Sequence, residues 1–527
     1  MAISRRRFVH SSLLAGAALA IPSIRGFDRL KKGTLAGINP FILQNPGAVF
    51  IMRTRVNRKT DSSEIRNAGL DFGRSVFCLT DDEEKGIPLT HKVVIKPNLT
   101  CRSRDHPGYT IERSMGIVTD AFFVEGIIKS LQELGFSPGQ FYIREVNCPD
   151  DLADGGYTEM ATRTGIDLQC IDTPAGELSH DKIQWIDVPG GVWFKRIPYL
   201  WPVNAPDTFL LNISKFKAHS MGLTLCAKNL QGTIAMNYQA HCKSFGELMN
   251  GVDLGDLNSA ANAEIMDSYN RHKASGIPRW DRPGSSGGIW QETWVNRCID
   301  NNSVTLAGLH IIEGIYGRDG NFMDGPGANG LANDYMTNYI IFGRNQFHVD
   351  NIGHYLGGHE PGNFGLFHIA KERGMASTIN PAEIPLYEWD KDEGAKTAEL
   401  SSFTRYPLKT NYLRRDYNCG NEPYWHMVNE SYEYGTINNE ILFSLEQNFP
   451  NPVRTTTRII FVIPSGGHVR AEVFNPKGML AEVLVDRQLN AGTHSISWNA
   501  VNYPSGLYFC RIFFDGSFRS QKIMVIH

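Results

Sequence analysis

The stretch Val93-Val94-Ile95-Lys96-Pro97-Asn98 places three β-branched apolar residues directly before a lysine and an asparagine. The segment Thr119–Leu134 follows, and its apolar residues recur at the spacing of one helix face until Gly135 ends the pattern. A second apolar run, Phe141–Ile143, comes next. Short apolar strands separated by helices favour an α/β domain with a largely parallel sheet.

The same alternation continues along the chain. Further apolar runs and helical patterns lie at Thr208–Ile213, Leu309–Ile312, His348–Leu356 and Phe364–Arg373. The region 240–300 between them is polar and rich in glycine, and we expect long loops there. We assign residues 45–400 to the α/β domain.

The composition is that of a globular protein. Of 527 residues, 42% are hydrophobic and 20% are charged, which excludes a fibrous or wholly disordered chain. The formal net charge of −3 gives no basic surplus, so we expect no nucleic-acid partner. The 9 cysteines include no Cys-x-x-Cys pair, and we therefore expect no iron–sulfur cluster.

Residues 1–26 have the features of a signal peptide. Arg5-Arg6-Arg7 precede Phe8-Val9, and a short apolar run ends in Ala18-Leu19-Ala20. The run is shorter than the about 20 apolar residues of a transmembrane helix, and we expect no such span in the mature chain. Adjacent arginines before Phe-Val resemble twin-arginine signals, which would add that export machinery as a partner and a route through the periplasm. A general secretory signal that happens to hold three arginines is the alternative.

Residues 445–527 predict a small all-β sandwich, preceded by a linker at 401–444. Short alternating or apolar segments recur at Arg458–Ile463, Val469–Phe474, Ala481–Val485, His494–Trp498, Leu507–Phe514 and Lys522–Ile526. Turn residues such as Pro464-Ser465-Gly466-Gly467 separate them. Short strands at this spacing are typical of a β-sandwich.

The tail also has a specific order of motifs. These are Gln447–Pro452, Val473–Gly478, Ala491–His494, Trp498–Ala500, Pro504–Tyr508 and the closing Lys522–Ile526. Their order resembles the type A sorting domain of type IX secretion. The resemblance implies export by the type IX machinery to the cell surface or medium of a Gram-negative bacterium. It implies nothing about the chemistry of the protein.

Polar residues follow the predicted strands at their carboxyl ends. They are Lys96 and Asn98, Glu145, Lys215 with Lys217 and His219, Lys228 with Asn229, and Glu313. Parallel sheets bind ligands beyond the carboxyl ends of their strands, so we expect these side chains to line one cleft. Clustered lysines suit a small anionic ligand, a phosphate or a carboxylate. For any single lysine, a solvated loop charge is the alternative.

Several of these residues lie in longer motifs. They are Val93–Leu99, Ser214–His219 with Ala227–Gly232, and Val349–Gly357 with Ile369–Gly374. In this order they resemble the domain of unknown function 362 family, over roughly residues 45 to 375. The resemblance implies no general activity. The chain departs from it at Glu313, where we expect Asp, and lacks the ferredoxin-like cysteine cluster of some members.

The segment from His219 through Gly222 and Lys228 to Gly232 is similar to a stretch of the nickel-pincer lactate racemase family, although the spacing differs slightly. That similarity implies proton transfer at His219 and a cofactor tether at Lys228. A histidine shuttles protons near neutral pH, and a desolvated lysine is a nucleophile. His219 and Lys228 are therefore candidates for catalysis, and Glu145 joins them as a candidate acid/base or metal-ligand group. A structural hydrogen bond is the alternative for His219.

The remaining polar residues at the strand ends are candidates for substrate binding: Lys96, Asn98, Lys215, Lys217, Asn229 and Glu313. A second cluster includes Asp350 and His354, four residues apart on one face of a predicted helix. This spacing suits a divalent metal, and helix-capping or surface histidines are the alternative.

Two classes of function follow from the sequence. The first is an exported enzyme for a small anionic substrate, with Lys/His-dependent isomerase- or racemase-like chemistry or metal-assisted chemistry. The second is a non-catalytic surface protein that binds a ligand or a metal. A divalent metal and a Lys-tethered cofactor both remain open.

Overall fold

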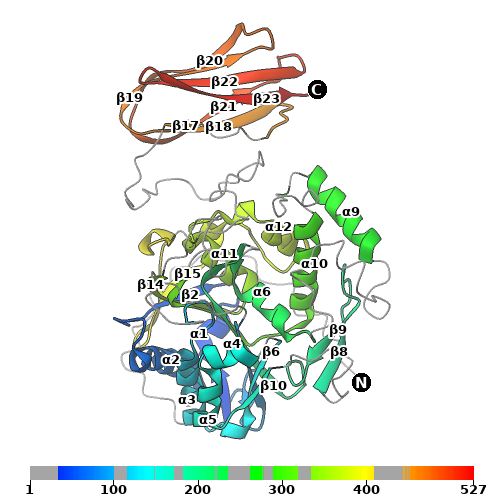
Figure 1. Cartoon of the computed structure of the whole chain (residues 1–527), viewed down its shortest axis with the longest axis vertical. Coiled ribbons are helices and arrows are strands. Elements are labelled where there is room, and N and C mark those ends of the chain that lie inside the picture. The colour runs from blue at the N-terminus through cyan, green and yellow to red at the C-terminus, as the bar shows by residue number, and fades with distance from the viewer. Residues whose placement is uncertain are drawn as a thin grey trace.

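A computed structural model gives the fold (Figure 1). It describes residues 34–99, 115–146, 149–170, 182–219, 222–235, 261–275, 277, 289–318, 334–406, 408, 443–445, 448 and 450–527. The predicted signal peptide at 1–26 and most of the predicted linker lie outside the described residues.

A nine-stranded sheet forms the centre of the α/β domain, in the order β16-β15-β2-β14-β13-β10-β5-β6-β7. Its strands are β2 (Val49–Arg53), β5 (Lys92–Pro97), β6 (Phe141–Glu145), β7 (Asp167–Cys170), β10 (Thr208–Lys215), β13 (Leu309–Arg318), β14 (Asp334–Gly343), β15 (Leu386–Asp390) and β16 (Gly394–Thr397). Strands β13, β10, β5, β6 and β7 run parallel to one another. Only the pairs that include β14 or β16 are antiparallel. The predicted α/β domain with a largely parallel sheet is confirmed.

Small sheets and helices surround the central sheet. The small sheets are β3-β1-β4 (Phe77–Thr80, Leu35–Ile38, Ile87–Pro88), β8-β9 (Ile183–Asp187, Arg196–Leu200) and β11-β12 (Lys217–His219, Gly222–Thr224). The helices are α1 (Pro40–Gln44), α2 (Ser62–Val76), α3 (Ala121–Leu134), α4 (Pro149–Asp154), α5 (Tyr157–Thr164), α6 (Cys226–Asn229), α9 (Ala261–Ala274), α10 (Ile289–Val304), α11 (Gln346–Leu356) and α12 (Gly365–Glu372). Short 3-10 turns lie at Pro138–Gln140, Leu230–Thr233, Pro361–Asn363, Pro381–Glu383 and Leu400–Ser402. Within these described residues, no helix is long and apolar enough to span a bilayer.

Both faces of the sheet are covered, which explains the continuous apolar strands. Val93 and Ile95 of β5 pack into a core shared with α2 and α3. Val94, which points the other way, belongs to a separate core with residues of β8 and β9. Strands buried on both faces read as unbroken apolar runs rather than as alternating ones.

Helix α3 shows how local sequence sets an element. The side chain of Asp120 accepts hydrogen bonds from the backbone N–H groups of Phe122 and Phe123, and so caps the first turn. At the other end Gly135 adopts a φ of 118°, which favours glycine, and the helix stops there as predicted. Val124, Ile127, Ile128 and Leu131 of the predicted apolar face are buried, and Leu134 is partly buried.

The expectation of long loops at 240–300 is wrong for the part of that region that the structure describes. It contains α9 and most of α10. Helix α10 buries polar side chains such as Glu292, Asn296 and Asp300, which are paired by other groups of the protein. The hydrophobic period that marks an amphipathic helix is therefore absent from its sequence.

The C-terminal strands form two antiparallel sheets, and the predicted strand segments are confirmed. One sheet has the order β17-β18-β21 and the other β20-β19-β22-β23. The strands are β17 (Ser444–Leu445), β18 (Thr456–Ile463), β19 (Gly467–Phe474), β20 (Leu480–Leu489), β21 (Gly492–Asn499), β22 (Gly506–Phe514) and β23 (Ser517–Val525). Apolar residues from both sheets, among them Phe461 and Ile512, join one buried cluster. Figure 1 shows these strands as a group of their own after the α/β domain.

Helices α2 and α3 approach each other closely where two glycines meet the facing backbone. A Cβ added at Gly126 would lie 2.2 Å from the carbonyl oxygen of Arg66 and 2.6 Å from the amide nitrogen of Leu70. A Cβ at Gly69 would lie 2.1 Å from the carbonyl oxygen of Phe123. Because the obstacles are backbone atoms, they can yield only if the helices separate.

We expect Gly126→Ala to destabilise the domain by about 2 kcal/mol or more in urea unfolding, since overpacking typically costs 1–3 kcal/mol. The gain of about 1 kcal/mol in helix propensity opposes this and does not cancel it. Gly139→Ala is the control, because nothing lies within 4 Å of its added Cβ. Equal stability of the two variants would contradict the close helix contact.

Candidate functional site

The four predicted strand ends lie side by side. Strands β13, β10, β5 and β6 are consecutive neighbours in the sheet and all run parallel. Lys215 on β10 is in register with Glu313 on β13, and Lys96 on β5 is in register with Asn212 on β10. The carboxyl edge of the sheet therefore gathers these polar side chains in one place.

Lys96 is fully buried and its charge is balanced inside the protein. Its Nζ donates to Oε2 of Glu145 at 2.6 Å, to the carbonyl of Pro97 at 2.6 Å and to Oδ1 of Asn229 at 3.1 Å. Burial lowers the pKa of Lys96, and Glu145 opposes that shift. With three acceptors for three ammonium protons, Lys96 has no donor left for a ligand.

The backbone at Gly232 packs directly against the Lys96–Glu145 ion pair. A Cβ there would lie 2.0 Å from Oε1 of Glu145 and 2.7 Å from Cε of Lys96. The carbonyl of Gly232 accepts a hydrogen bond from the backbone N–H of Val146 at 3.0 Å. Glycine is thus required at this position by the close approach of backbone to the ion pair.

Lys215 and Glu313 form a second buried pair, with 2.5 Å between Nζ and Oε2. Glu313 also accepts from the backbone N–H groups of Asp120 at 3.2 Å and Ile315 at 3.0 Å. The Nζ of Lys215 lies 4.2 Å from the centre of the Tyr316 ring. Burial raises the pKa of Glu313, and the charge of Lys215 opposes that shift.

Three buried asparagines join the strands to α6. Asn229 donates from Nδ2 to Oδ1 of Asn212 at 2.8 Å and to the carbonyl of Lys96 at 3.0 Å. Its Oδ1 accepts from Nδ2 of Asn98 at 3.3 Å. Asn98 and Asn229 are therefore brought together with Lys96, as predicted for a common site.

Lys228 differs from Lys96 and Lys215. It lies on α6 with a side chain only 5% exposed. Its charge lowers the pKa of the neighbouring Lys96, so the two ammonium groups are close enough to interact. Within the part of the chain that the structure describes, its Nζ makes no hydrogen bond or ion pair. A buried lysine that the protein leaves unpaired is suited to an anionic ligand or to nucleophilic chemistry.

His219 and Lys217 lie on β11, the first strand of a hairpin with β12 that follows β10. Both are fully buried, and both have interaction partners in the protein. The neighbouring Gly222 has a φ of 98°, and its Cα faces the ring of Phe364. His219 is thus held inside the domain, not on an open surface.

Asp350 and His354 do share a face of α11, but their surroundings differ. Both carboxylate oxygens of Asp350 accept backbone N–H groups of α6, and burial raises its pKa to about 7. His354 packs on the rings of Phe364 and Phe367, with centroids 4.9 and 5.1 Å away. Among the described residues, no group of three or more His, Cys, Asp or Glu is arranged to hold a metal. A metal at Asp350 and His354 stays a prediction.

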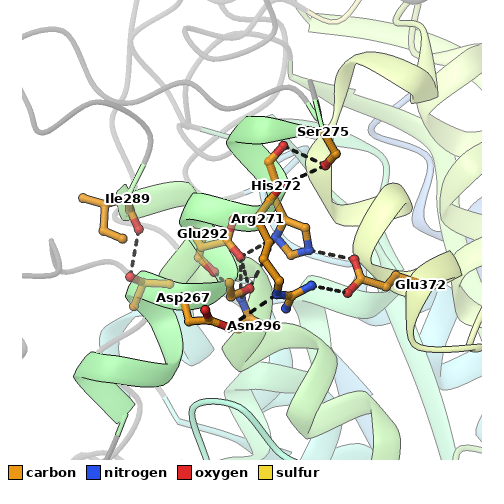
Figure 2. A network of polar contacts seen from close by, with 10 residues as sticks. Asp267, Arg271, His272, Ser275, Ile289, Glu292, Asn296 and Glu372 are labelled. Carbon is orange, nitrogen blue, oxygen red and sulfur yellow. Dashed lines mark hydrogen bonds and ion pairs between the residues drawn. The ribbon is translucent and has the colours of Figure 1, made fainter.

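A polar network that the sequence did not predict joins α9, α10 and α12 (Figure 2). His272 faces Oε1 of Glu292 at 2.8 Å through Nδ1 and Oε2 of Glu372 at 2.7 Å through Nε2. Ser268 donates to the same oxygen of Glu292 at 2.5 Å. The i, i+4 spacing of Ser268 and His272, which places them on one helix face, is the sequence pattern that could have indicated this network.

This network is not a hydrolase triad, although it contains serine, histidine and glutamate. In a triad the serine and the acid occupy opposite ring nitrogens of the histidine. Here Ser268 and Glu292 both lie at Nδ1 of His272, and Glu372 occupies Nε2. The network links three helices and leaves no nitrogen to take up a serine proton.

Comparison with known proteins confirms the two resemblances. Residues 93–354 match the family model described as Domain of unknown function (DUF362), and residues 447–526 match the Secretion system C-terminal sorting domain. No curated protein matches the chain. A crystal structure of dimeric latent PorU from Porphyromonas gingivalis is similar at 22% identity and a TM-score of 0.13, over 15% of this chain and 9% of that chain. This chain thus spans less than a tenth of PorU, and no conclusion about the fold rests on the likeness.

We expect Lys215→Met to destabilise the protein by about 3–5 kcal/mol at neutral pH, because Glu313 is then buried without its partner. The raised pKa of Glu313 favours its neutral form in the folded state. The loss should therefore grow as pH rises through that pKa and shrink in acid. Urea unfolding at several pH values measures it.

The double variant Lys215→Met/Glu313→Gln is the control, because it removes both charges and keeps an acceptor oxygen near the backbone N–H groups of Asp120 and Ile315. It should recover most of the lost stability and show a weaker dependence on pH than Lys215→Met alone. A double variant no more stable than the single one would argue against a coupled pair.

Proposed function

We propose that this protein acts outside the cell on a small anionic ligand, a carboxylate or a phosphate, at the carboxyl edge of its central sheet. The sorting domain indicates a secreted or cell-surface protein, and the DUF362 match gives no activity. The single observation that supports the ligand class is Lys228, a buried cation without an ion-pair partner among the described residues. An anion would supply the missing counter-charge.

In this proposal the two buried ion pairs build the site and Lys228 contacts the ligand. Glu145 and Glu313 neutralise Lys96 and Lys215. The two ion pairs therefore fix the strand ends and add little net charge to the site. Asn98 and Asn229 complete the base of the site, where the side-chain amide of Asn98 donates a hydrogen bond to that of Asn229. Lys217 stands on the hairpin that adjoins this edge.

The proposed reaction class is isomerase- or racemase-like. His219 would move a proton on the substrate, and Glu145 would hold the charge of Lys96 during that step. The similarity to nickel-pincer lactate racemases supports proton transfer at His219, with Lys228 as the residue that would hold a tethered cofactor.

A non-catalytic ligand-binding surface protein is the second candidate. It is favoured by the complete internal pairing of Lys96, whose three protons are all donated within the protein. A site with so few free groups could bind an anion without transforming it. Binding without turnover would separate this candidate from the first.

We expect inorganic phosphate or lactate to bind the wild-type protein in titration calorimetry, and Lys228→Met to weaken that binding about tenfold or more. Loss of a charge-assisted contact in a buried site has this magnitude. Lys129→Met, an exposed lysine on α3, is the control and should bind as the wild type does. Undiminished binding by Lys228→Met would refute the role of Lys228.

We also propose that export begins at the twin-arginine machinery and that the two C-terminal sheets form the β-sandwich of the sorting domain. The shared apolar cluster of the two sheets supports the sandwich. Arg5→Lys/Arg6→Lys should retain the full-length precursor in the cytoplasm of the native host, as measured by fractionation and immunoblotting. Normal secretion of that variant would favour a general secretory signal instead.

A further inference from the structure

Helix α6 is too short to hold its own position. It has four residues, Cys226–Asn229, whereas isolated helices need roughly 12–15 residues to be even marginally stable in water. Its geometry must therefore come from bonds to the elements around it. Since α6 includes Lys228, those bonds also fix where the lysine backbone stands.

Asp350 of α11 supplies the bonds at the start of α6. Its Oδ1 accepts from the backbone N–H of Cys226 and its Oδ2 from that of Ala227, both at 2.7 Å. The carboxylate is 1% exposed, so the two charge-assisted bonds replace water. Lys228 is the next residue along the chain.

The same two residues of α6 are held from the carbonyl side as well. Nδ2 of Asn212 donates to the carbonyl of Cys226 at 2.8 Å, and Nδ2 of Asn302 to that of Ala227 at 2.9 Å. The N–H groups thus bind one neighbour and the carbonyl groups bind two others. Asp350 is the only one of these three groups that holds both residues.

We propose that Asp350 is a positioning residue that acts through α6 to hold Lys228 buried at the edge of the sheet. The inference rests on the proposed function, in which Lys228 is the group that meets the ligand. It assigns Asp350 to the α6 backbone rather than to a metal. Its removal should free the first turn of α6 and expose the Lys228 amine.

The experiment labels lysines of the intact protein with formaldehyde, an uncharged aldehyde that forms an imine with a lysine amine and releases water. Borohydride then reduces the imine to a stable secondary amine, and peptide mass spectrometry gives the labelling rate at each lysine. Lys215 is the internal reference, because it is fully buried and paired with Glu313.

We expect Asp350→Ala to raise the labelling rate of Lys228 about tenfold or more, since loss of two charge-assisted bonds favours local opening. Asp350→Asn keeps one acceptor oxygen and should give an intermediate rate. If Asp350→Ala does not fold, the labelling rate of Lys228 in Asp350→Asn is compared with the rates in the wild type and in Asn302→Leu. A rate in Asp350→Asn no higher than in the wild type would then overturn the proposal.

Asp300→Ala is the matched control. Asp300 is equally buried, and it accepts backbone N–H groups of Val192, Trp193 and Phe194 and an ion pair from Arg373, none of which belongs to α6. Its loss should leave the labelling of Lys228 unchanged. Equal rises in Asp300→Ala and Asp350→Ala, or no rise in Asp350→Ala, would overturn the assignment. Because labelling is measured without phosphate or lactate, the result does not depend on whether those anions bind.

Discussion

A charge that is removed from water must meet an opposite charge or a set of hydrogen-bond partners, and the carboxyl edge of the central sheet is built around that constraint. Lys96 is paired with Glu145, and Lys215 with Glu313. Each pair joins two adjacent parallel strands, so the ion pairs also fix the strand ends relative to one another. The amide of Asn229 then connects this edge to α6.

The two ion pairs lower the positive charge expected at the sheet edge from the lysines alone. In the sequence, four lysines at strand ends suggest a strongly positive cleft. In the structure, carboxylates neutralise Lys96 and Lys215, whereas Lys228 makes no ion pair with any described residue. Selection of an anion would then depend on one cation in a dry setting rather than on a broad positive field.

The fold could be predicted where a local rule decides the structure. The apolar run at Val93–Ile95 and the stop at Gly135 follow from burial on both faces and from a left-handed cap. Helix α10 could not, because its buried polar residues find partners far away in the chain, as Asp300 does with Arg373. Tertiary pairing of this kind leaves no period in the sequence.

The candidate site shows the same division. The gathering of these polar residues at one edge could be predicted, since the carboxyl ends of parallel strands meet at the same edge of a sheet. Their pairing could not, because Lys96 and Glu145 are separated by 49 residues, and Asp350 and Cys226 by 124. The i, i+4 spacing of Asp350 and His354 suggested a shared ligand. The Asp350 carboxylate already accepts backbone N–H groups of α6, and the spacing cannot reveal that contact.

An exported protein meets ionic strengths that the cell does not control. Dissolved salt weakens exposed pairs such as Arg74–Glu133, whose side chains are 40% and 29% exposed. It acts far less on Lys215–Glu313, whose side chains are both 0% exposed. The geometry of the sheet edge is therefore insulated from the salinity of the surroundings, while the outer surface of the domain is not.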